Sequence, residues 1–86
     1  MEMLLNKLKY RSWHRGTKEA DILLGKFFDS HYRKMSKEQL VEYKEFLEVV
    51  KDNDIVLIAQ GKKKWPNNYP KSIVRLFNKY INSGNS

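Results

Sequence analysis

The chain has 86 residues and a formal net charge of +7, so it fits one small domain, and its charge suits an acidic protein as well as a nucleic acid. The lack of cysteine excludes a disulfide scaffold and a thiolate metal site, and two histidines, His14 and His31, are too few to indicate a metal site. There is no signal-peptide h-region and no apolar run approaching the roughly 20 residues of a membrane span, so we expect a soluble protein of the bacterial cytoplasm.

The first predicted element is a helix over about 3–13, whose leucines recur at helical spacing. Residues 14–16 interrupt the pattern, and Gly16 can adopt the positive φ that ends or begins a helix. A second helix is predicted over about 17–33, with Thr17 or Gly16 as its cap. Its apolar face follows i, i+3, i+4 spacing and comprises Ala20, Leu23, Leu24, Phe27, Phe28 and Tyr32.

The third helix has the clearest start signal in the sequence. Ser36 is a predicted N-cap, and Gln39 three residues later completes a capping box. Met35 and Leu40 occupy the two positions of a hydrophobic staple around this box. The buried stripe that follows is predicted to contain Leu40, Tyr43, Phe46, Leu47 and Val50.

Residues 52–61 are ambiguous, because the β-branched run Ile55–Ile58 is compatible with a buried strand. Asp52 is a good helix cap and Gly61 a good helix stop. A single strand would have no partner, since no other segment has strand character. We therefore predict a short helix here.

A loop with two prolines separates this segment from a fifth predicted helix over about 70–81, for which Pro70 suits the first position. The apolar face of this helix comprises Ile73, Val74, Phe77, Tyr80 and Ile81. Residues 82–86 are predicted to be a frayed polar tail. The predicted fold is all-α, a compact bundle of five short helices forming a single domain over residues 1–86.

The segment around the turn after the first helix combines an arginine, a glycine and two acids. Arg15 can be solvated, pair with Glu19 across the turn, or make a bidentate contact with another molecule. Glu19 and Asp21 lie in the first turns of the second helix, where the helix dipole favours negative charge, so spacing alone favours a structural role. Tyr10 and Trp13 are more typical of a core than of a contact.

The pattern Arg15-Gly16-x-x-Glu19-x-Asp21 resembles the RGxxE signature of the succinate dehydrogenase assembly factors, which promote covalent attachment of FAD to the flavoprotein subunit. The resemblance covers nearly the whole chain, from about Leu4 to Phe77. It is supported by Trp13 before the motif, Phe27-Phe28 with Tyr32, and Asp52-x-Asp54 with Gly61. The sequence departs from the family pattern where His14 replaces an arginine, Ala20 a leucine and Ile58 a tryptophan.

The resemblance implies a chaperone-like assembly factor that forms a 1:1 complex with the flavoprotein subunit of succinate dehydrogenase, with fumarate reductase as a further candidate client. It implies that FAD belongs to the client, that the factor binds no cofactor stably and is not itself an enzyme, and that it is a monomer when free. The partner-binding residues would be Arg15, Gly16 and Glu19, with a rim of Tyr10, Trp13, His14 and Asp21. No metal site is expected.

Two alternatives remain from the sequence. A small basic helical domain could bind nucleic acid, although the acidic stripe Glu38, Glu42 and Glu45 disfavours entry into a groove. A general protein-interaction bundle is also compatible with the composition. An enzyme in its own right is disfavoured, because the sequence has no Gly-rich phosphate loop, no nucleophile beside a base and no metal cluster.

Overall fold

A computed structural model of the chain describes residues 2–84. They form five α-helices and a short 3-10 turn, with no strand in this part of the chain. The predicted all-α class with five helices is therefore confirmed. The elements are α1 (Glu2–Trp13), α2 (Lys18–His31), the 3-10 turn (Tyr32–Lys34), α3 (Lys37–Val49), α4 (Asp52–Ala59) and α5 (Lys71–Gly84).

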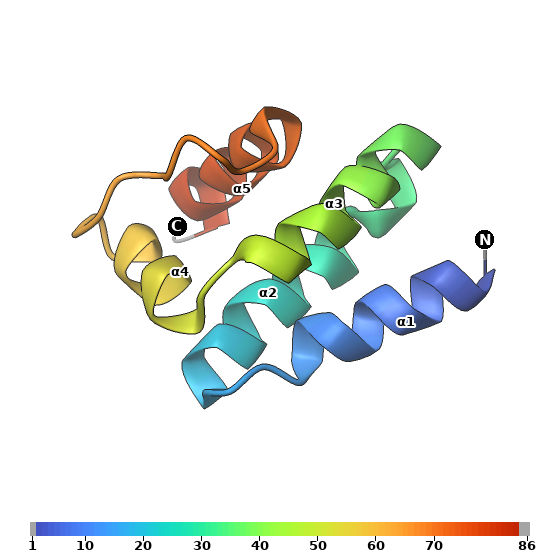
Figure 1. The fold of residues 1–86 in the computed structure, drawn as a ribbon, viewed down its shortest axis with the longest axis horizontal. Helices are drawn as coiled ribbons and strands as arrows, with labels where there is room; N and C mark the ends of the chain where they lie inside the picture. Colours follow the sequence, from blue (N-terminus) through green and yellow to red (C-terminus); the bar gives the residue numbers. More distant parts are fainter. Residues whose placement is uncertain (1, 85–86) are drawn as a thin grey trace.

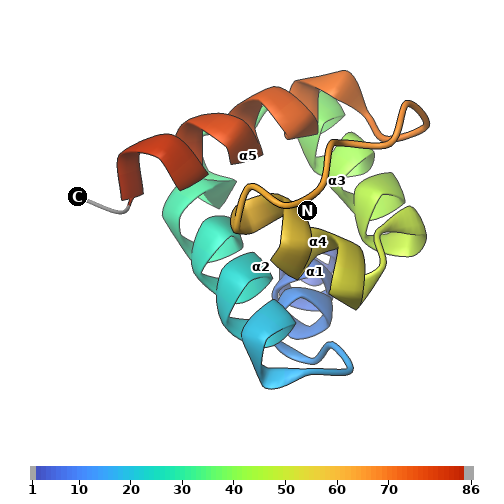
Figure 2. The same ribbon diagram turned by 90° about the vertical axis from the view of Figure 1, so that its left-hand side faces the viewer.

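The first three helices run side by side with alternating direction, and α1 packs against both α2 and α3 (Figure 1). The short α4 packs against α2 at the end of the molecule where the turn between α1 and α2 lies. Figure 2 shows α5 crossing the opposite side, where it packs on α3. The turn between α1 and α2 therefore lies close to the junction between α3 and α4.

The core is formed by the apolar faces that the sequence spacing predicts. Phe27 is fully buried, and its ring centroid lies 4.6 Å from that of Phe77 and 5.8 Å from that of Tyr43. One buried polar contact crosses this core: Ser12 Oγ donates to the backbone oxygen of Leu8 at 2.8 Å and lies 2.5 Å from the Tyr43 hydroxyl. Because the hydroxyl proton of Ser12 is already donated to Leu8, the Tyr43 hydroxyl is the donor in its hydrogen bond with Ser12. Burial raises the pKa of Tyr43.

The start of α3 confirms the predicted capping box. Ser36 Oγ accepts from the backbone N–H of Gln39 at 3.1 Å, and Gln39 Oε1 accepts from the backbone N–H of Ser36 at 3.0 Å. Met35 and Leu40 are both buried. The Gln39 amide also donates to Ser72 Oγ at 3.2 Å, which connects the start of α3 to the first turn of α5.

The helical prediction for the ambiguous fourth segment is confirmed, but its predicted cap is wrong. Lys51 is the N-cap residue of α4 and Asp52 is the first helical residue. The Asp52 carboxylate does not cap its own helix, because it is used by a distant segment described below. Gly61 has φ = 77°, the left-handed conformation that glycine adopts at a helix end.

The last helix begins one residue later than predicted and continues further. Pro70 precedes α5, and its carbonyl accepts from the backbone N–H of Val74 at 3.0 Å. The helix extends to Gly84, so residues 82–84 of the predicted frayed tail are helical. Residues 85 and 86 lie outside the described part of the chain.

Candidate functional site

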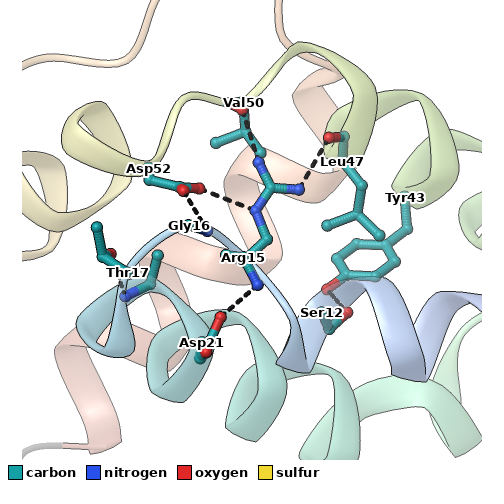
Figure 3. Close-up of polar contacts among 10 residues, drawn as sticks. Ser12, Arg15, Gly16, Thr17, Asp21, Tyr43, Leu47, Val50 and Asp52 are labelled. Carbon is teal, nitrogen blue, oxygen red and sulfur yellow. Dashed lines mark hydrogen bonds and ion pairs between the residues drawn. The ribbon is translucent and has the colours of Figure 1, made fainter.

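Arg15 points into the molecule and joins three segments (Figure 3). Its Nε donates to Asp52 Oδ1 at 2.9 Å, and its two terminal nitrogens donate to the backbone oxygens of Leu47 at 3.1 Å and Val50 at 2.9 Å. These carbonyls belong to the end of α3, which has no further turn to use them. The guanidinium thus caps α3 while pairing with the first residue of α4.

The environment of Arg15 favours these contacts in two ways. Its side chain is only 16% exposed and that of Asp52 22% exposed, so water screens this pair less than it screens a surface pair. The positive charge lies at a helix C-terminus and the negative charge at a helix N-terminus, and both placements agree with the helix dipoles. Of the roles weighed for Arg15, pairing across the turn with Glu19 is not the one observed, since Arg15 pairs with Asp52.

Gly16 is required here for close approach and not for positive φ. Its backbone N–H donates to Asp52 Oδ2 at 2.6 Å, and a Cβ on Gly16 would lie 2.7 Å from the same oxygen. Gly61 is the glycine with positive φ in the described residues. Of the two caps considered for the second helix, Thr17 is the one observed, since its side chain accepts from the Ala20 N–H at 3.2 Å, and Gly16 does not have the positive φ considered for it.

Asp21 also supports the turn between α1 and α2, which we define as residues 14–17. Its Oδ1 accepts a short hydrogen bond from the backbone N–H of Arg15. The successive N–H groups of Arg15 and Gly16 thus donate to two different carboxylates, Asp21 from α2 and Asp52 from α4 (Figure 3). Asp21 is half-buried and, like Arg15, has a partner within the chain.

Glu19, in contrast, is exposed. It lies at a groove of about 350 Å³ between α2, α4 and α5, whose lining is otherwise mostly apolar. Ile22 from the same groove is 39% exposed. Glu19 is the charged residue of this lining, which comprises Glu19, Ile22, Leu23, Val56, Ala59, Gln60, Tyr80 and Ile81.

The other flank of the turn is aromatic. Tyr10 is 64% exposed, and its ring stacks on His14 with centroids 4.1 Å apart and an interplanar angle of 14°. Trp13 is half-buried and donates from Nε1 to Asp29 Oδ2 at 3.2 Å. The sequence favoured a core position for both aromatic residues, and neither lies fully in the core. Tyr10 is exposed, and Trp13 lies against Gly25 of α2 at the edge of a shallow depression that Tyr10, His14 and Asp29 also line.

The predicted site residues therefore divide into two groups. Arg15, Gly16 and Asp21 are brought together by hydrogen bonds to one another and to Asp52. The side chains of Tyr10, His14 and Glu19 are exposed, although His14 Nδ1 lies 2.9 Å from the Tyr10 backbone oxygen, and Trp13 is half-buried. Asp52 also belongs to this site and was not predicted to. The Asp-x-Asp pattern was the available signal, but it was interpreted as a helix start and as support for the family resemblance, and not as part of the site.

The described residues add two negative observations. Among residues 2–84, no group of three or more His, Cys, Asp or Glu side chains could hold a metal ion. No helix in this range is both long enough and apolar enough to cross a bilayer.

The sequence matches a protein family described as flavinator of succinate dehydrogenase over residues 6–81. Succinate dehydrogenase assembly factor 2-A, mitochondrial, from Drosophila yakuba is 34% identical over 94% of this chain and 51% of its own length. Assembly factor 2-B, mitochondrial, from Drosophila simulans is 32% identical over 94% of this chain and 53% of its own length. The chain thus spans about half the length of these relatives.

A shorter match covers 49% of the chain and 14% of succinate dehydrogenase assembly factor 2, mitochondrial, from Aspergillus flavus, at 50% identity. No solved structure matches the chain. These comparisons contradict the expected location in the bacterial cytoplasm, because the matched relatives are mitochondrial proteins of eukaryotes. They give no support to the nucleic-acid-binding alternative.

Proposed function

The chain belongs to the family of flavinators of succinate dehydrogenase, and from this membership we propose that it binds the flavoprotein subunit of that enzyme and promotes covalent attachment of FAD to it. The family match over residues 6–81 carries this proposal, since it includes both flanks of the turn between α1 and α2. The names of the matched relatives, which describe assembly factors of succinate dehydrogenase, support the same client.

Within the RGxxE pattern, Glu19 is the residue best placed to touch the client. It is exposed beside an apolar groove, so a client segment can bury apolar side chains there while donating hydrogen bonds to the carboxylate. A charge-assisted hydrogen bond of this kind contributes about 1.5–3 kcal/mol. Tyr10 and His14 form the second contact, on the aromatic flank of the turn.

FAD is assigned to the client and not to this chain. The groove beside Glu19 contains an acid as its charged lining residue, and a carboxylate repels the pyrophosphate of a dinucleotide. The depression on the other flank is lined by Asn6, Lys9, Tyr10, Trp13, His14 and Asp29 and offers no helix N-terminus to a phosphate. We therefore expect weak binding of free FAD or none.

The chain contributes to flavinylation by holding the client, and it is not an enzyme itself. Fixing a mobile part of the client in one geometry reduces the entropic barrier of the reaction. Charges placed around the site stabilise the charge that develops in it. Both effects require a rigid contact surface on this chain, and the hydrogen bonds of Arg15 and Gly16 provide one.

The test is in vitro flavinylation of the purified apo flavoprotein subunit with FAD, measured as covalent flavin fluorescence of that subunit in a denaturing gel. Glu19→Ala should lose most of the stimulation. Glu38→Ala is a matched control, because Glu38 is likewise exposed and is the second residue of its helix after a lysine. Equal stimulation by wild type and Glu19→Ala would show that Glu19 is only a helix-start carboxylate.

The composition of the complex needs a separate measurement. Light scattering after size exclusion should give a 1:1 complex of the chain with the flavoprotein subunit, and a monomer for the free chain. Titration calorimetry of FAD into the isolated chain should give no stoichiometric binding. Tight binding at one FAD per chain would show that the assignment of FAD to the client alone is wrong.

A further inference from the structure

Asp52 uses both of its carboxylate oxygens on a segment that lies far away in the sequence. Oδ1 accepts from Arg15 Nε at 2.9 Å, and Oδ2 accepts from the Gly16 backbone N–H at 2.6 Å (Figure 3). We infer that Asp52 is a positioning residue for the client contact: it fixes the turn between α1 and α2 so that Glu19 and His14 meet the client. This inference rests on the proposed function.

The conformation of Arg15 disfavours the simpler assignment, in which Arg15 itself binds the client. All three of its guanidinium nitrogens donate within the chain, to Asp52 and to the carbonyls of Leu47 and Val50. These bonds use three of the five N–H groups of the guanidinium, so a bidentate contact with a client carboxylate would have to use the two that are left, on a side chain that is only 16% exposed. The arginine of the RGxxE pattern therefore binds within the chain, and its ion-pair partner is Asp52.

The hydrogen bonds of Asp52 fix the backbone of the turn as well as a side chain. The N–H of Gly16 is held by Asp52, and the preceding N–H of Arg15 is held by Asp21. Two successive peptide groups are thus fixed from two helices, α4 and α2 (Figure 3). The turn leads directly into the first turn of α2, where Glu19 is the second residue, so the position of the turn sets the position of Glu19.

Asp54 shows that this role is particular to Asp52. It lies in the same first turn of α4, and its side chain is similarly buried, at 18% exposed against 22% for Asp52. However, Asp54 pairs with Lys63 at 2.6 Å, in the loop after its own helix, and not with the turn. The two acids share the favourable placement at a helix N-terminus, and only Asp52 reaches Gly16.

The experiment compares Asp52→Asn with Asp54→Asn in the full chain. The first change keeps the shape of the side chain but removes its charge and one of its two acceptor oxygens. The second removes a similar charge from the same helix turn and leaves the Gly16 contact intact. Four quantities are measured for each variant: the amide proton shift of Gly16 by NMR, the thermal melt, the affinity for the apo flavoprotein subunit, and the flavinylation of that subunit.

For Asp52→Asn we expect a large shift of the Gly16 amide resonance and a loss of client affinity of roughly tenfold to a hundredfold, the range that corresponds to one hydrogen bond to a charged group. Asp54→Asn should leave the Gly16 amide and the affinity near wild type. In a Glu19→Ala background, Asp52→Asn should cause a smaller further loss than in the wild-type chain, because the Glu19 contact is already absent and only the His14 contact is left to be displaced. This non-additivity distinguishes positioning from general destabilisation.

Three outcomes would overturn the inference. Equal affinity of wild type and Asp52→Asn for the client, despite a moved Gly16 amide, would overturn the positioning role and leave the proposed function intact. Equal affinity losses for Asp52→Asn and Asp54→Asn would show a general effect of the α4 charge. If the wild-type chain neither binds the apo flavoprotein subunit nor stimulates its flavinylation, the proposed function fails, and the positioning role fails with it.

Discussion

Replacing Gly16 by alanine tests the close approach between the turn and α4. The added Cβ would lie 2.7 Å from Asp52 Oδ2, which is too near for a nonbonded contact. No backbone atom obstructs the Cβ, and Gly16 has no positive φ, so the strain can be relieved if the Asp52 carboxylate swings away. The cost of Gly16→Ala is then the loss of the hydrogen bond from the Gly16 N–H to Asp52.

The magnitude follows from these contacts. A hydrogen bond to a charged group contributes about 1.5–3 kcal/mol, and alanine offsets about 0.4–1 kcal/mol by restricting the unfolded chain. A net destabilisation near 1.5 kcal/mol lowers the Tm of a domain of this size by about 6–12 °C. Thermal melts followed by circular dichroism measure this change directly.

Two further variants make the test specific. In an Asp52→Ala background the obstructing carboxylate is absent, so Gly16→Ala should no longer destabilise the chain. Gly61→Ala is the control, because Gly61 has φ = 77° and a Cβ added there would have no neighbour within 4 Å. Its cost of roughly 1–2 kcal/mol arises from backbone strain and should be the same in both backgrounds. Additive effects of Gly16→Ala and Asp52→Ala on the free energy of unfolding would refute the clash with Asp52.

Three other expectations follow from single contacts. Glu19→Ala should change the free energy of unfolding by less than about 1 kcal/mol, the size of a helix-dipole term, while flavinylation of the client falls; a fall in flavinylation that only tracks the Tm would contradict the contact role. Gly25→Ala should destabilise the chain more than Gly16→Ala, because its Cβ would lie 2.2 Å from the Trp13 ring, and tryptophan fluorescence should report the displaced indole. Burial raises the pKa of Tyr43, so above pH of about 10 the unfolded chain loses a phenol proton that the folded chain keeps. Stability should therefore decline as pH rises through that range, and urea melts of Tyr43→Phe should show a shallower decline than wild type.

Features that depend on near neighbours in the sequence could be predicted well. The Ser36–Gln39 capping box was correct in both of its hydrogen bonds, because its partners lie three residues apart. The stop at Gly61 was likewise correct. The five helices follow from apolar spacing, since a helix that buries one face repeats that face every three to four residues.

The candidate site could be predicted only in part, because its central contacts join distant segments. Gly16 and Asp52 are separated by 36 residues, and no residue near Gly16 in the sequence indicates that a carboxylate lies against this glycine in the fold. A glycine in a turn is often explained by positive φ, which is the conformation considered for Gly16 and is not the one that the structure shows. The direction of Arg15 depends on the end of α3, whose position relative to the turn is a result of tertiary packing.

The connection between Arg15 and Asp52 also bears on how the chain folds and unfolds. It joins residues 37 positions apart, whereas the contacts between α1 and α2 close a short loop, so the entropy of closure is larger for the ion pair. We expect the pairing of α1 with α2 to form early and the connection to α4 to form after the folding transition state. Removing it should then accelerate unfolding and leave the folding rate nearly unchanged. The turn at residues 14–17 would be protected mainly by a slow unfolding step, so Asp52 would govern how long each molecule keeps its contact surface intact.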